Sequence, residues 1–169
     1  PLGEGIDQDG AANILGSQLY GLRLPYNHKS WEAGFFSRNL EARTFSSIDS
    51  TLIPKTHLAL QTDGTTVRFY VNGRFVGSSE TKPVSMKSSP ALGADFTKAV
   101  EGVPISSANH FHGIIDEVRI SNVARYTKDF KPETRLENDE DTLALYHFDE
   151  GQGDVLKDSS GNGHHGKIV

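Results

Sequence analysis

The 169-residue chain contains no cysteine. This absence excludes disulfides, thiolate metal sites and a cysteine nucleophile. Its apolar runs are far shorter than the roughly 20 residues that a membrane-spanning helix needs, so we expect no membrane insertion. No basic run exceeds two residues and the formal net charge is −5, which argues against a nucleic-acid partner. No signal peptide is visible, and we expect the domain to be truncated at the N-terminus.

Glycine, in contrast, is abundant, with 17 residues that lie between short apolar runs. Because glycine reaches positive φ without strain, this distribution favours a fold with many tight turns. Hydrophobic residues make up 36% of the chain and charged residues 23%. The chain can therefore bury a core, and we expect one domain over residues 1–169.

The clearest local pattern lies between residues 57 and 77. Apolar residues alternate with polar or small ones on both sides of Asp63-Gly64, and Asn72-Gly73 follows at once. Such alternation around two tight turns predicts a half-buried, three-stranded antiparallel meander. The side chains that we expect to face the core are Leu58, Leu60, Val67, Phe69 and Val71, joined by Val118 and Ile120 from a later strand.

Shorter segments elsewhere carry the same two-residue period. We expect strands within residues 14–24, 34–38, 42–48, 90–96, 111–120 and 143–148. A helical turn or two is expected at 122–126, and loops at 78–89, 97–109 and 127–142. Many short strands with almost no helix predict an all-β fold, an antiparallel two-sheet jelly-roll sandwich.

Three motifs carry a family resemblance. The meander reads HLALQTDGTTVRFYVNGRFVG, residues 111–120 read FHGIIDEVRI, and residues 145–151 and 158–166 read LYHFDEG and DSSGNGHHG. Together they resemble the laminin-G-like, concanavalin-A-like jelly-roll domains, over roughly the C-terminal two-thirds of the chain. The resemblance implies a concanavalin A-like sandwich, in a family that includes both binding modules and glucanases.

The third motif departs from the family pattern, because it normally opens the domain and here it closes the chain. Two interpretations follow for residues 143–169. The segment either folds back as a closing strand or begins a second repeat. We favour folding back, because a sandwich without its outer strand would expose unpaired backbone groups.

A glucanase is the enzymatic alternative. Retaining glycosidases need two carboxylates about 5 Å apart, which on one strand requires acidic residues two or four positions apart. Asp116 and Glu117 are adjacent and so would face opposite sides of a strand. No third carboxylate follows them, and no G-x-S-x-G nucleophile motif occurs. We therefore expect a protein that is not an enzyme.

The family resemblance also suggests a structural Ca²⁺, held by carboxylates and carbonyl oxygens. On that basis Asp116, Asp149 and Asp158 are the candidate ligands. Each also has a structural interpretation. Asp158 can cap its own turn, Asp149 can orient the glycine turn that follows it, and Asp116-Glu117 can form a salt bridge with Arg119 or another basic residue.

Glycan-binding jelly rolls use an exposed aromatic ring beside polar groups. The candidate ligand-binding residues are Trp31, Tyr26, Asn27 and Arg38, although Trp31 can equally fill one end of the core. The resemblance implies a recognition module of a secreted or cell-surface protein that binds a glycan or a protein partner beside other domains of the same polypeptide. The alternative is a structural or assembly repeat without a ligand of its own.

Overall fold

The structure is a computed structural model, and it describes residues 11–16, 21–25, 32–34, 55–80, 91–96, 107–108, 110–111 and 113–169. Among these residues there is no helix, and hence none that could cross a membrane. All strand pairs are antiparallel, which confirms the all-β class. The strands are β1 (Ala11–Gly16), β2 (Gly21–Pro25), β3 (Glu32–Gly34), β4 (Leu58–Thr62), β5 (Thr66–Val71), β6 (Arg74–Glu80), β7 (Ala91–Leu92), β8 (Asp95–Phe96), β9 (Ser107–Ala108), β10 (Val118–Ser121), β11 (Thr142–Tyr146), β12 (Val155–Leu156) and β13 (Gly166–Lys167).

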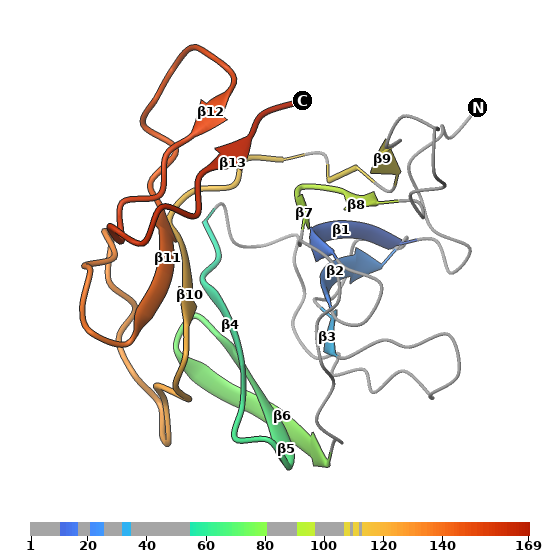
Figure 1. The fold of residues 1–169 in the computed structure, drawn as a ribbon. Helices are drawn as coiled ribbons and strands as arrows, with labels where there is room; N and C mark the ends of the chain where they lie inside the picture. Colours follow the sequence, from blue (N-terminus) through green and yellow to red (C-terminus); the bar gives the residue numbers. More distant parts are fainter. Residues whose placement is uncertain are drawn as a thin grey trace.

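The strands form two main groups. In Figure 1 the β4–β5–β6 meander and the β10–β11 pair occupy one part of the molecule, and the sheet ordered β3–β2–β1–β7 lies opposite them. Smaller pairs, β8–β9 and β12–β13, complete the described strands. The arrangement places the segment after β10 on the outside of the meander (Figure 1).

The predicted meander is confirmed. Leu58 pairs with Val71 across β4 and β5, and Thr66 pairs with Glu80 across β5 and β6. β6 therefore continues through residues 78–80, which the sequence had assigned to a loop, because they pair with the start of β5. On the inner face Phe69 is 0% exposed, and it forms a core with Val71, Leu58, Leu60 and Val76.

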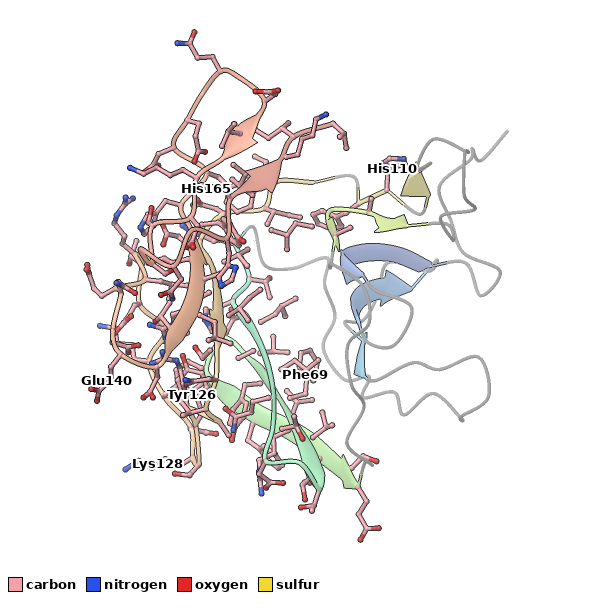
Figure 2. The ribbon with its side chains drawn as sticks, viewed as in Figure 1. Phe69, His110, Tyr126, Lys128, Glu140 and His165 are labelled. Atoms are coloured by element: carbon pink, nitrogen blue, oxygen red, sulfur yellow. The ribbon has the colours of Figure 1, made fainter. Side chains whose placement is uncertain are left out.

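The outer face of β5 is buried too, so the expectation of a half-buried meander is wrong for this strand. Tyr70 is only 1% exposed. Its ring lies edge-on to Phe75 and Tyr126, and Phe130 stacks on Tyr126 with ring centroids 3.5 Å apart. Phe69 and Tyr126 lie on opposite sides of the meander in Figure 2. The segment after β10 thus forms a second layer over the sheet.

A second core lies between β10, β11 and β12. Its buried residues are Ala144, Tyr146 and Leu156, with Leu92, Val118, Ile120 and Phe148 packed against them. Strand β10 begins only at Val118, so the prediction of a strand from residue 111 is wrong for 113–117. Glu117 has φ 53°, in the left-handed region that interrupts a strand, and Ile114 is 94% exposed.

Several strands begin or end at residues other than the predicted ones. Residues 14–24 are not one strand but parts of the hairpin β1–β2, in which Ala12 pairs with Leu24. The strand expected at 90–96 is split into β7 and β8 at Gly93, whose φ is 78°. The strand expected at 34–38 shares only Gly34 with β3, and residues 35–38 and 42–48 lie outside the described residues. No helix forms at 122–126.

The turn at residues 158–164, called the edge turn below, covers the free side of β11. One side of β11 pairs with β10, and on the other side the backbone of Leu145 faces the edge turn. Ser159 N donates to Leu145 O at 2.7 Å, and Leu145 N donates to Asp158 Oδ1 at 3.0 Å. These bonds satisfy backbone groups that an open strand edge would leave unpaired.

Candidate functional site

A hollow with a volume of about 390 Å³ lies in the described part of the chain, and we call it the 119–139 groove. It is formed by the end of β10 and the irregular segment between β10 and β11. Its lining combines aromatic, cationic, anionic and amide side chains: Arg119, Arg125, Tyr126, Phe130, Lys131, Glu133, Glu137, Asn138 and Asp139.

The aromatic pair of the groove is fixed to the outer face of the meander. Tyr126 N donates to Gln61 Oε1 at 2.9 Å, and Tyr126 O accepts from the side chain of Gln61 and, at 2.9 Å, from the hydroxyl of Tyr70. Phe130 N donates to Gly73 O at 2.8 Å. The two rings are nearly parallel, with an interplanar angle of 4°. A rigid aromatic element of this kind needs no reordering when a ligand binds.

An ion pair fixes the other side of the groove. Both terminal nitrogens of Arg125 donate to Asp139, each at 2.6 Å, and Nε donates to Ser121 Oγ at 2.6 Å. Thr142 Oγ1 donates to the same carboxylate at 2.7 Å. The Arg125 guanidinium, followed by the Thr142 hydroxyl, holds the pKa of Asp139 well below its usual range. This pair therefore stays charged at neutral pH and ties β10 to β11.

The remaining charged side chains of the groove face solvent. Lys131, Glu133 and Glu137 are exposed, and Arg119 donates to the Glu137 carbonyl at 3.1 Å. The lining has three cationic side chains, at 119, 125 and 131, and three anionic ones, at 133, 137 and 139, so its charges cancel. Such a surface offers many hydrogen-bond donors and acceptors without favouring an ion of either sign.

A second, smaller hollow of about 270 Å³ lies beside β11 and β12. Its lining residues are Arg135, His147, Asp149, Glu150, Lys157 and Ser159. Behind it the carboxylate of Glu117 accepts from Leu136 N at 2.8 Å and contacts His147 Nδ1 at 3.0 Å. Glu117 and Phe148 both have positive φ, so the backbone is strained at Glu117 and directly after His147.

The three predicted calcium ligands lie in different surroundings. Asp116 is 3.9 Å from Lys55 Nζ, and Asp149 accepts from Arg135 at 2.8 Å. In the described part of the chain no three acidic or histidine side chains are grouped to hold a metal ion. The three residues therefore do not fit one calcium site.

Asp158 is the most constrained of the three. It is 3% exposed, and its two oxygens accept from Leu145 N, Ser160 N, Ser160 Oγ and His164 N at 2.8–3.0 Å. Burial, the largest single influence, would raise its pKa, but these hydrogen bonds together hold the pKa well below its usual range. Asp158 thus caps its own turn, the structural role weighed for it from the sequence.

The adjacent acids at 116 and 117 also differ from expectation. They do not lie on opposite faces of a strand, because both precede β10. Their structural interpretation, a salt bridge with Arg119 or another basic residue, agrees with the structure, in which Glu117 pairs with Arg135 at 3.5 Å. The partner could not be read from the sequence, since it lies 18 positions away.

The predicted ligand-binding residues lie outside the described residues: Trp31, Tyr26, Asn27 and Arg38. The 119–139 groove was missed because most of its lining belongs to residues 127–142, whose lack of any period predicts only a loop. The available signal was composition, since Tyr126 and Phe130 stand among five charged residues between positions 125 and 133.

Comparison with known proteins places the chain in a family. The family model of the concanavalin A-like lectin/glucanases superfamily matches residues 5–129, well over half of the 169-residue chain. No curated protein and no solved structure matches the chain.

Proposed function

Because the chain belongs to the concanavalin A-like lectin/glucanases superfamily, we propose that it is a non-catalytic recognition module that binds an uncharged glycan in the 119–139 groove. The superfamily match confirms the resemblance seen in the sequence, and with it the antiparallel β-sandwich class. The lectin-like fold supports ligand binding in general. The choice of site and ligand is our proposal.

The observation that carries this proposal is the composition of the groove. Sugars present apolar C–H faces and many hydroxyls, so their sites combine aromatic side chains with planar donors and acceptors. The Tyr126–Phe130 pair and Asn138 supply this combination, beside charged groups that cancel. A polyanionic ligand would favour an excess of Lys and Arg, which this groove lacks.

The ionisation of the carboxyl groups supports a role without catalysis. A glycosidase needs a carboxylic acid whose pKa is raised so that it can protonate the leaving group. Within the described residues every carboxyl group with a resolved shift has a lowered pKa: Asp63, Asp139 and Asp158. In the groove itself, Asp139 is held as a carboxylate by Arg125.

We further propose that the module acts outside the cell, as part of a longer polypeptide whose other domains it directs to a glycan. The support is the superfamily membership, and the absence of cysteine makes the fold independent of redox conditions in any compartment.

A glycan array that includes neutral and acidic oligosaccharides, followed by calorimetric titration, tests the proposal. We expect binding to neutral glycans and at least about tenfold weaker binding by a Lys131→Ala/Glu133→Ala variant, because a lost charged hydrogen bond costs about 1.5–3 kcal/mol. The matched control is Lys128→Ala, an exposed lysine outside the groove lining (Figure 2).

Three results would contradict the proposal. These are no binding to any glycan, equal affinity in the groove variant and the control, or release of reducing sugar from the bound glycan over time. The last result would restore the glucanase alternative.

A further inference from the structure

The sequence contains two Asn-Gly pairs, Asn72-Gly73 and Asn162-Gly163. Asparagine is thermolabile, and a following glycine increases the risk because it has no Cβ to hinder its own backbone nitrogen. The two pairs share the same local chemistry. Their flanking residues differ, Val71 and Arg74 against Gly161 and His164, and so does what the fold places around each pair.

The first pair is enclosed. Asn72 N donates to His57 O at 2.8 Å, and His57 N donates to Asn72 Oδ1 at 2.9 Å. Gly73 is buried, its carbonyl accepts from Phe130 N, and a Cβ on Gly73 would collide with the carbonyl oxygen of Phe130. The backbone and side chain of this turn cannot rearrange without lifting the 126–130 segment from the sheet.

The second pair is open. Asn162 and Gly163 are both exposed, and nothing lies within 4 Å of the position a Cβ on Gly163 would take. The same holds for the preceding Gly161. The Asn162 side chain makes two hydrogen bonds, in which Nδ2 donates to Thr142 O and to Leu143 O, each at 3.0 Å. This turn has room to reach the geometry of ring closure.

We propose that Asn162 is a site of spontaneous deamidation in the folded protein and that the fold protects Asn72. Gly163 N attacks the side-chain carbon Cγ of Asn162, a new C–N bond forms, and the amide nitrogen leaves as ammonia with the proton from Gly163 N. Water then adds to either carbonyl of the resulting succinimide and opens the ring. The product is aspartate or isoaspartate, and no reagent other than water is consumed.

Deamidation of Asn162 would remove hydrogen bonds that join the edge turn to β11. The amide of Asn162 is a donor toward the carbonyls of Thr142 and Leu143 on β11, whereas a carboxylate has only acceptors. Its charge would face two carbonyl oxygens and would lie near Asp158, which begins the same turn. Deamidation should therefore loosen the contact that covers β11.

Incubation of the full chain at mildly alkaline pH, followed by peptide mapping with mass spectrometry, tests this inference. The replacement of the amide by a carboxyl group is read as a mass increase on the peptide that carries it. We expect Asn162 to convert at least about tenfold faster than Asn72, since an opening that costs only about 1.4 kcal/mol slows a reaction tenfold. In guanidinium chloride the two rates should become similar.

The variant Asn162→Gln is the matched control, because it keeps an amide and Gly163 but requires a larger ring. It should abolish the mass increase on this peptide. Equal rates at the two sites in the folded protein, faster conversion of Asn72, or the same rate ratio in guanidinium chloride would each overturn the inference. None of these results depends on whether a glycan binds.

Discussion

At the scale of single residues, Gly73 lies where the meander meets the segment after β10, so a substitution there would affect both layers. Its φ of 75° disfavours any side chain, and the carbonyl of Phe130 occupies the space that a Cβ would need. Gly64 is the matched case, because its φ is also positive, at 93°, but nothing lies within 4 Å of a Cβ built on it.

We predict that Gly73→Ala lowers the free energy of unfolding more than Gly64→Ala does. The left-handed conformation costs about 1–2 kcal/mol in either variant, and the collision with Phe130 adds about 1–3 kcal/mol at Gly73 alone. Urea unfolding of the two variants measures the difference. Equal losses would show that the segment carrying Phe130 does not pack against this turn.

His57 should make the free energy of unfolding depend on pH between about 5 and 7.5. Its ring lies edge-on to Phe130, and Nδ1 is buried without a hydrogen-bond partner among the described residues. Burial, and then the charge of Arg119, lower its pKa below the usual 6.5, with Glu133 opposing them. The folded state thus favours the neutral ring.

The sign of the pH effect follows from this lowered pKa. Above pH 6.5 the ring is neutral in both states, and as the pH falls below 6.5 the unfolded chain takes up a proton first, so stability decreases. We predict that His57→Phe reduces this loss between pH 7.5 and pH 5, as measured by urea unfolding at both values. A variant that loses as much stability as the parent chain would contradict the assignment.

At the scale of elements, the edge turn and β11 depend on one carboxylate. Asp158 joins the turn to the backbone of Leu145, and its lowered pKa means that the bonds are fully present above about pH 4 and are lost as the pH falls through the folded-state pKa. The same contact protects the free side of β11 from pairing with other chains.

We predict that Asp158→Ala lowers the free energy of unfolding by about 3 kcal/mol, because several backbone and hydroxyl donors lose their acceptor. It should also promote self-association through β11. The control is Asp154→Ala, an exposed residue of the same hairpin. Urea unfolding and analytical ultracentrifugation measure the two effects. A monomer as stable as the control would show that the edge turn does not hold β11.

At the scale of the whole molecule, the second core depends on the pairing of β10 with β11. The superfamily match ends at residue 129, whereas β11 lies beyond it and pairs Val118 with Tyr146. This pairing agrees with folding back of the C-terminal segment. Whether residues 143–169 complete this domain or also begin another stays a prediction.

A bound glycan should stabilise the whole molecule if only the folded state binds it. At a ligand concentration of about 100 times Kd, the gain is about 2.7 kcal/mol, and for a chain of this size the melting temperature should rise by about 5–10 °C. Thermal melts with the best glycan from the array measure this rise. A similar rise in the Lys131→Ala/Glu133→Ala variant would place the ligand outside the 119–139 groove.

The sequence alone determined the meander and its turns. Alternation of side chains and the Asp63-Gly64 and Asn72-Gly73 turns are local properties, since strand period and positive φ depend only on near neighbours. The same alternation predicts which side chains between Leu58 and Val71 face inward. The cap formed by Asp158 is local too, because its hydrogen-bond partners in the turn lie within six residues.

The position and lining of the 119–139 groove were decided only by the tertiary structure. Tyr70 meets Tyr126 across 56 positions, and Glu117 meets His147 across 30. An irregular segment has no period from which its position can be read, so its contacts depend on which surface the rest of the fold leaves uncovered. The groove exists because residues 126–130 cover the outer face of β5, and that packing is a property of the folded chain.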